Sequence, residues 1–171
     1  MIAVVSLTAG LAAIYQLTAA TAAADTGATR SVPTCRTSDL VVWLDTRGGA
    51  AAGSVYYHLE FTNLASKSCS LRGYPGVSAV GLRGEQRGHP ASRNPQHLSR
   101  TVTLTRGSSA FTILQISNAA NFPVSVCKPT TAAGVRVYSP GQTASQIVPF
   151  PFPACSRSKP VYLSVESIQQ T

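Results

Sequence analysis

The sequence is poor in the residues from which active sites are built. It has six carboxylates and three histidines in 171 residues, too few to expect the converging carboxylates of a glycosidase. No G-x-S-x-G motif is present, since Gly76-Val77-Ser78-Ala79-Val80 lacks the second glycine. His58 lies in an expected strand, and His89 and His97 have a spacing that suits no metal template. We therefore expect a protein that is not an enzyme and that holds no metal and no cofactor.

Cysteine is also scarce, and its arrangement excludes the usual zinc sites. The chain has four cysteines, Cys35, Cys69, Cys127 and Cys155, and the nearest two are 28 residues apart. A structural zinc site needs closely spaced pairs of ligands. Four cysteines in a protein of an oxidising compartment predict two disulfides, and three pairings of the cysteines are possible. We favour Cys35–Cys69 with Cys127–Cys155, in which each bridge closes a loop of about 30 residues and contributes roughly 3–4 kcal/mol.

No charged residue precedes Asp25, and the first segment is apolar or small from Ile2 to Leu17. It ends in Ala22-Ala23-Ala24, an A-x-A cleavage pattern. We predict a signal peptide over residues 1–24, a flexible tether over 25–34 and a single domain over 35–171, and hence a secreted or cell-envelope protein. An uncleaved N-terminal anchor is the alternative, although the apolar run is short against the roughly 20 residues of a membrane span. The opening lacks the usual Lys or Arg, so a translation start upstream of Met1 stays open.

Negative charge is in short supply: 14 Lys and Arg stand against 6 Asp and Glu, a formal net charge of +8. An excursion over residues 83–106 concentrates the surplus, with Glu85 its only acid and five arginines, Arg83, Arg87, Arg93, Arg100 and Arg106. Long loops on a rigid β scaffold often carry recognition, and a basic exported protein is attracted to anionic surfaces. We predict a binding loop for an anionic envelope component, or for another envelope protein, with at most peripheral membrane contact. A solvated loop is the alternative, and export argues against nucleic acid.

No segment has helical periodicity of useful length, so the chain is expected to be all-β. The clearest strand is Ser54 to Asn63, in which alternation places Val55, Tyr57, Leu59 and Phe61 inward and Tyr56, His58, Glu60 and Thr62 outward. The other expected strands are 40–44, 77–82, 101–105, 110–117, 124–127, 134–138, 146–150 and 161–167. Residues 47–53 are expected as a loop, and 101–117 as a hairpin around residues 106–108. This pattern predicts an antiparallel β-sandwich.

Two aromatic residues stand among prolines in Phe150-Pro151-Phe152-Pro153. The segment is either an exposed docking strip or a sheet edge that packs its rings into the core, with the prolines blocking further strand pairing.

Several segments together resemble the domain of unknown function family 4232, which occurs mainly in exported proteins and lipoproteins of actinobacteria. The most specific part is Cys-Ser-Leu-Arg-Gly-Tyr-Pro-Gly-Val at 69–77, and 39–40, 59–63, 104–114, 127, 135–142 and 154–155 continue the likeness in order. It covers roughly Cys35 to Val165. Two positions depart from the pattern of the family. Arg106-Gly107 stands where the family is expected to have Pro-Gly, and Ser139-Pro140 stands where Pro-Pro is frequent. Both departures still permit a turn.

The resemblance implies an immunoglobulin-like sandwich, an exported location and the same sequential cysteine pairing, and it implies no activity. We therefore expect a non-catalytic binding or structural module of the cell envelope. The alternative is a hydrolase that acts on envelope components, in which His58 or His97 would lie beside an acid.

Overall fold

The computed structural model describes residues 31–171, which form one compact unit. The predicted signal peptide and residues 25–30 of the predicted tether lie outside the described residues. The last tether residues are bound to the domain, because the backbone N–H of Ser70 donates to the Pro33 carbonyl at 2.8 Å and that of Cys35 donates to the Ser70 carbonyl at 2.9 Å. Within residues 31–171, no helix has the length and apolar character needed to cross a bilayer.

Strands make up most of the described chain. In chain order the elements are η1 (Thr37–Asp39), β1 (Leu40–Ala51), β2 (Ser54–Asn63), β3 (Cys69–Leu71), β4 (Gly76–Val80), β5 (Gln86–Arg87), β6 (Ser92–Arg93), β7 (Val102–Leu104), β8 (Ser109–Ser117), η2 (Ala119–Asn121), α1 (Val124–Cys127), β9 (Pro129–Tyr138), β10 (Ser145–Cys155), β11 (Leu163–Val165) and β12 (Gln169–Gln170).

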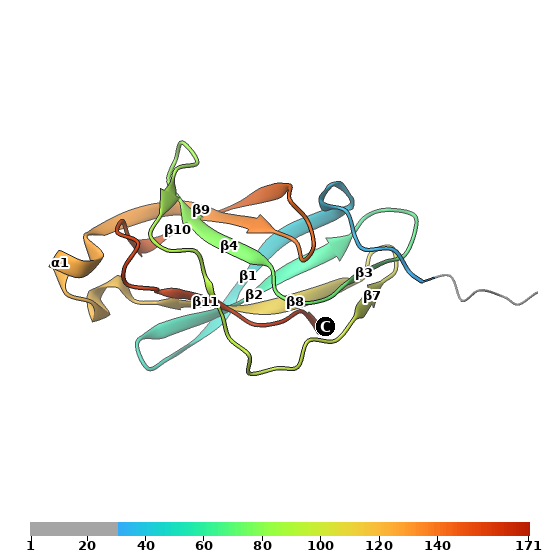
Figure 1. The fold of residues 1–171 in the computed structure, drawn as a ribbon, viewed down its shortest axis with the longest axis horizontal. Coiled ribbons are helices and arrows are strands. Elements are labelled where there is room, and N and C mark those ends of the chain that lie inside the picture. The colour runs from blue at the N-terminus through green and yellow to red at the C-terminus, as the bar shows by residue number, and fades with distance from the viewer. Residues whose placement is uncertain (1–30) are drawn as a thin grey trace, which may run out of the picture. The chain divides into compact units, whose positions relative to one another are not determined.

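Two sheets pack face to face (Figure 1). The larger has the strand order β1-β2-β8-β11-β6, with β12 also paired to β8, and the smaller has the order β10-β9-β4-β5. A separate two-stranded sheet joins β3 to β7. Every strand pair is antiparallel except β11 with β6. The predicted all-β, antiparallel sandwich is confirmed.

The core lies between the two sheets and follows from the alternation of apolar residues along the strands. Leu59 and Phe61 of β2 are completely buried, as predicted, and Leu114 lies beside them on β8. Val135 and Val137 of β9 meet this layer from the smaller sheet. Burial of each such side chain contributes about 1.5–3 kcal/mol, so the inward face of β2 is strongly determined.

The prediction of a loop over residues 47–53 is wrong, because β1 continues to Ala51 and stays paired with β2. The register shifts between Asp45 and Gly49, where a β-bulge absorbs the extra residues. A Cβ at Gly48 would collide with the Tyr56 carbonyl, so the bulge requires glycine there. The hairpin then turns through Ala52 and Gly53 with φ of 48° and 73°, a turn usually indicated by Asn-Gly rather than Ala-Gly.

Two further local predictions are wrong. The strands around residues 106–108 do not pair with each other, because β7 pairs with β3 while β8 pairs with β2 and β11. Residues 124–127, expected as a strand, form the short helix α1. Pro123 precedes its first turn and Lys128 ends it in the left-handed conformation, with φ of 48°. Four residues are too few for either a helical or a strand period to be recognised.

The phenylalanine–proline segment lies in β10, at the edge of the smaller sheet. Phe152 is buried, and the Phe150 ring meets Tyr57 edge-on with the ring centroids 5.0 Å apart. Proline is tolerated at such an edge because the unpaired side of the strand needs no N–H donor. The sheet-edge alternative is therefore the correct one.

Both disulfides have the predicted pairing. Cys35 is bonded to Cys69 and Cys127 to Cys155, with sequence separations of 34 and 28 residues. No free cysteine is present among the described residues. Two closed disulfides indicate an oxidising, extracytoplasmic environment.

Each bridge is expected to stabilise the domain by a similar amount. The double variants C35A/C69A and C127A/C155A should each lose about 3–4 kcal/mol of unfolding free energy, because loops of about 30 residues are released in the unfolded chain. Denaturant titration measures this loss, with the reduced wild-type protein as the reference for losing both bridges. A loss below about 1 kcal/mol in either variant would contradict the chain-entropy account.

Candidate functional site

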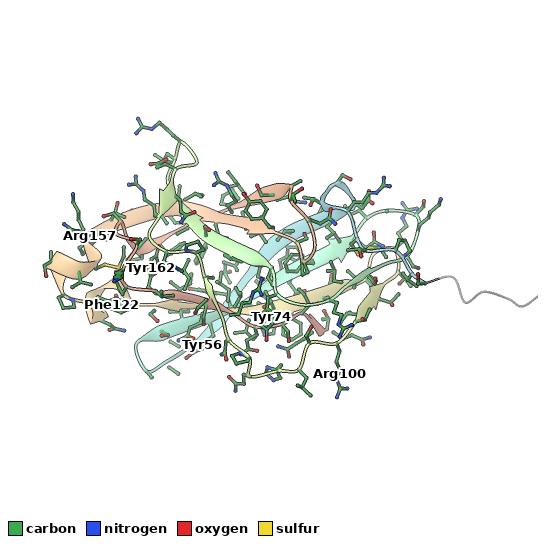
Figure 2. All side chains as sticks on the ribbon, in the orientation of Figure 1. Tyr56, Tyr74, Arg100, Phe122, Arg157 and Tyr162 are labelled. Atoms are coloured by element: carbon green, nitrogen blue, oxygen red, sulfur yellow. A yellow bond between two sulfur atoms is a disulfide. The ribbon has the colours of Figure 1, made fainter. Side chains whose placement is uncertain are left out.

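The five arginines of the predicted binding loop belong to segments that join three different sheets. Arg87 is on β5 in the four-stranded sheet and Arg93 is on β6 in the larger sheet. Arg106 follows β7, which pairs with β3. The connection passes from the smaller sheet across to β7, and Arg100 lies on this last stretch (Figures 1 and 2). The structure therefore divides the predicted loop into separate stretches.

The arginine side chains also differ in what they contact. Arg87 is half-buried, its Nη2 lies 2.6 Å from Glu85 Oε1, and its carbonyl accepts a hydrogen bond from the Tyr162 hydroxyl at 3.0 Å. The Arg93 guanidinium lies 5.6 Å above the centre of the Tyr74 ring. The exposed Arg83, Arg100 and Arg106 have no ion-pair partner among residues 31–171. Arg87 thus supports the fold, whereas these last three are available to a partner.

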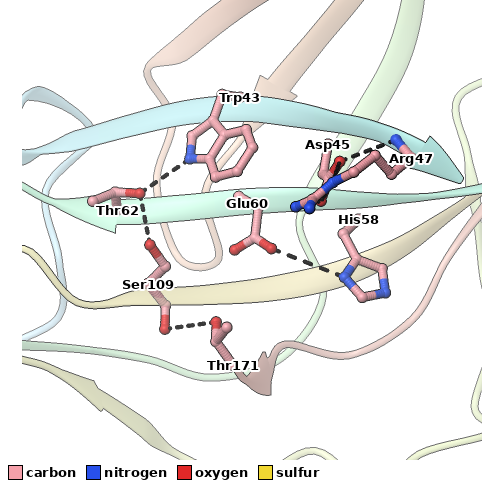
Figure 3. Close-up of polar contacts among 8 residues, drawn as sticks. All are labelled: Trp43, Asp45, Arg47, His58, Glu60, Thr62, Ser109 and Thr171. Carbon is pink, nitrogen blue, oxygen red and sulfur yellow. Dashed lines mark hydrogen bonds and ion pairs between the residues drawn. The ribbon is translucent and has the colours of Figure 1, made fainter.

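A second cluster, missed as a site in the sequence, lies on the outer face of the larger sheet. We call it the acid face and define it as Trp43, Asp45, Arg47, His58 and Glu60 (Figure 3). Cross-strand register brings these residues together, because Trp43 is opposite Glu60 and Asp45 is opposite His58. On the other side of β2, Phe111 of β8 is opposite Glu60.

Glu60 is the unusual member of the acid face. Alternation correctly predicted its direction, away from the core, but it is only 5% exposed because side chains of both flanking strands cover it. Its Oε1 lies 3.9 Å from His58 Nδ1, and its buried Oε2 has no hydrogen-bond partner. Burial raises the pKa of Glu60, against the opposing effect of His58. An unsatisfied buried acceptor costs about 1–3 kcal/mol, so this carboxylate is held at a cost to the fold.

Two aromatic rings border this carboxylate. Trp43 is 41% exposed, and its Nε1 donates a hydrogen bond to Thr62 Oγ1 at 3.1 Å. The Thr62 hydroxyl is also hydrogen-bonded to the Ser109 hydroxyl at 2.8 Å. His58 stacks on Phe111 with the ring centroids 4.3 Å apart. The acid face therefore combines a buried anion with partly exposed ring faces.

Asp45 is already paired within the chain. Arg47 donates from Nε to Oδ1 at 3.0 Å and from Nη2 to Oδ2 at 2.8 Å. These side-chain hydrogen bonds, and one from the Arg47 backbone N–H, lower the pKa of Asp45 to about 2. A cleft of about 370 Å³ opens beside this pair and is lined by Asp45, Arg47, Gly48, Gly49, Tyr56, His58 and Ile113.

A second histidine–acid contact joins the stretch between β6 and β7 to the residue that follows β11. His97 Nδ1 is 2.7 Å from Glu166 Oε2, which also accepts a hydrogen bond from Gln169 Nε2 at 3.0 Å. Both histidines named for the hydrolase alternative thus lie beside an acid. Over residues 31–171, however, no hydroxyl is hydrogen-bonded to the ring of His58 or His97, and no group of three potential metal ligands occurs.

An apolar cavity of about 460 Å³ opens at the β1–β2 turn, between the two sheets. Its walls include Val55, Tyr57, Ile116, Phe150 and Phe152. None of its lining residues is charged, so the cavity has little of the polar chemistry that orients a ligand.

A protein-family model described as Domain of unknown function (DUF4232) matches residues 35–171. The chain belongs to this family. No curated protein and no solved structure matches the chain significantly. The family description names no activity, so the function of this member has to be argued from its own surfaces.

The raised pKa of Glu60 predicts a pH-dependent effect of its removal. A raised folded-state pKa means that Glu60 favours folding at low pH and that this stabilisation is lost as the pH rises through the folded-state pKa. E60Q should therefore be more stable than the wild type at pH 7, by about 1 kcal/mol, and equally stable near pH 4.

The matched control is E85Q, because hydrogen bonding and nearby arginines lower the pKa of Glu85. Its stabilisation is present at neutral pH and is lost on acidification, so E85Q should be less stable than the wild type at pH 7. Thermal unfolding at pH 4 and pH 7 measures both effects. Destabilisation by E60Q at pH 7 would show that the carboxylate is better accommodated than its burial indicates.

Proposed function

We propose that this chain is an exported, non-catalytic binding module of the cell envelope whose basic excursion contacts an anionic envelope component. The observation that carries the proposal is that the exposed Arg83, Arg100 and Arg106 have guanidinium groups that form no ion pair with any described residue. The net charge of +8 supports it, as do the two disulfides. Secretion through residues 1–24, an immunoglobulin-like topology and an actinobacterial setting stay predictions.

Two exposed leucines, one directly before the excursion and one within it, favour a lipid surface as the anionic component. Leu82 is 95% exposed and directly precedes Arg83, and Leu98 is 82% exposed and lies two residues before Arg100. Apolar side chains beside arginines suit the boundary between headgroups and acyl chains. Each arginine near an anionic leaflet contributes about 1 kcal/mol, which is about a fivefold gain in affinity for every arginine that reaches the surface.

Charge reversal tests this proposal. The variant R83E/R100E/R106E should lose at least tenfold in affinity for vesicles that contain phosphatidylglycerol, measured by co-sedimentation of the full chain. The control K128E/R157E/K159E makes the same change in net charge at exposed basic residues around the end of α1, and Arg157 lies at the α1 end of the molecule, far from Arg100 (Figure 2). The control should lose much less affinity for the same vesicles than the variant R83E/R100E/R106E.

Two further measurements separate a lipid surface from a wall polymer. L82S/L98S should weaken vesicle binding and leave retention on purified cell-wall material unchanged. Equal losses in the two charge-reversal variants would show that only net charge matters, and the assignment of the excursion would then be wrong.

The hydrolase alternative has one observation in its favour, the 2.7 Å contact between His97 and Glu166. An acid that orients a histidine is part of a nucleophilic site, which also requires a hydroxyl or thiol next to the histidine. If the protein is a serine hydrolase, a fluorophosphonate probe will label the full chain, and H97A will abolish the labelling. Absence of labelling in the wild type would rule out the serine hydrolase, and the binding module would remain as the proposed function.

A further inference from the structure

We propose that the acid face binds the guanidinium group of an arginine in a basic partner segment. This goes beyond the proposed function, because the partner has the opposite charge and the surface is a different one. The excursion residues Arg83, Arg100 and Arg106 are not part of the acid face, which consists of outward residues on β1 and β2.

The first argument is charge complementarity. Glu60 is a buried carboxylate whose Oε2 has no hydrogen-bond partner, and a buried charge is normally paired. The nearby cation Arg47 is already engaged, since its hydrogen bonds go to Asp45. His58, at 3.9 Å, carries charge only when it is protonated. A cation from outside the chain would supply the missing partner.

The second argument concerns the kind of cation. Arg47 shows that a guanidinium fits this face, because it makes a two-pronged contact with Asp45 while its side chain stays 87% exposed. The partly exposed Trp43 ring offers a surface on which a planar cation can stack. A guanidinium can donate paired hydrogen bonds and stack at once, whereas an ammonium group is more strongly hydrated and has no plane. Arginine is therefore favoured over lysine.

The third argument is the space for the rest of the segment. The cleft of about 370 Å³ beside His58 runs along Gly48, Gly49 and Tyr56, and it can accept the residues that flank the arginine. Access to Glu60 Oε2 requires one bordering ring to turn aside. Trp43 is held by a single side-chain hydrogen bond, to Thr62, and His58 by stacking on Phe111, so either rotation breaks few contacts.

Trp43 is the only tryptophan in the chain, so its fluorescence reports directly on this surface. Titration of the full chain with acetylated tetra-arginine amide should give a saturable change in Trp43 emission. E60Q, which keeps the shape but removes the charge, should weaken binding at least tenfold. E85Q removes a carboxylate elsewhere and should bind like the wild type. Tetra-lysine should bind at least fivefold more weakly than tetra-arginine.

Three results would overturn the inference. The first is an E60Q titration identical to that of the wild type. The second is an equal Trp43 response to a neutral oligosaccharide, which would make the face a sugar platform. The third is a Trp43 signal that depends on protein concentration without peptide and disappears in E60Q, which would make a second copy of the chain the occupant. R83E/R100E/R106E should bind the peptide normally, so failure of this inference and failure of the proposed function are distinguishable.

Discussion

The central position of β2 decides the rest of the structure. This strand is hydrogen-bonded along its length to β1 on one side and β8 on the other, and its inward residues Leu59 and Phe61 are completely buried. Their burial contributes about 1.5–3 kcal/mol for each side chain. The two together outweigh the roughly 1–3 kcal/mol that an unsatisfied carboxylate oxygen costs. A shift by one residue would place Glu60 in the core and expose both apolar side chains. Glu60 therefore stays where its neighbours cover it.

Much of the fold could be predicted because its signals are local. Alternation along Ser54–Asn63 identified β2 and its two faces. The cysteine count predicted two disulfides and left three pairings open, of which the favoured sequential one is observed. The candidate site depends on which residues of distant strands lie side by side. Trp43 and Phe111 flank Glu60 through pairings that nothing in the local sequence specifies, so the outward direction of Glu60 was predictable but its burial was not. The choice of β3 rather than β8 as the partner of β7 is non-local in the same way.

The two proposed surfaces give the domain two binding properties of opposite sign. The excursion places unpaired arginines and exposed leucines around the connection from β4 to β7, whereas the acid face lies on the paired strands β1 and β2. A domain that rests on an anionic surface through the first would still present the second to a basic partner. In this arrangement, the net charge of +8 sets the attraction to the surface, and the buried carboxylate sets the selectivity for the partner.

The positions of the disulfides have a mechanical consequence. Cys35 is bonded to Cys69, and Cys127 to Cys155, so a pull applied between residue 31 and the C-terminus passes through the sulfur atoms and bypasses the chain between them. β1 and β2 lie within the first bypassed segment, and β9 with nearly all of β10 lies within the second. Under tension only residues 31–35, residues 69–127 and the stretch after Cys155 can be drawn out. The strands β1 and β2, which carry the acid face, would therefore bear no tension along their own backbone.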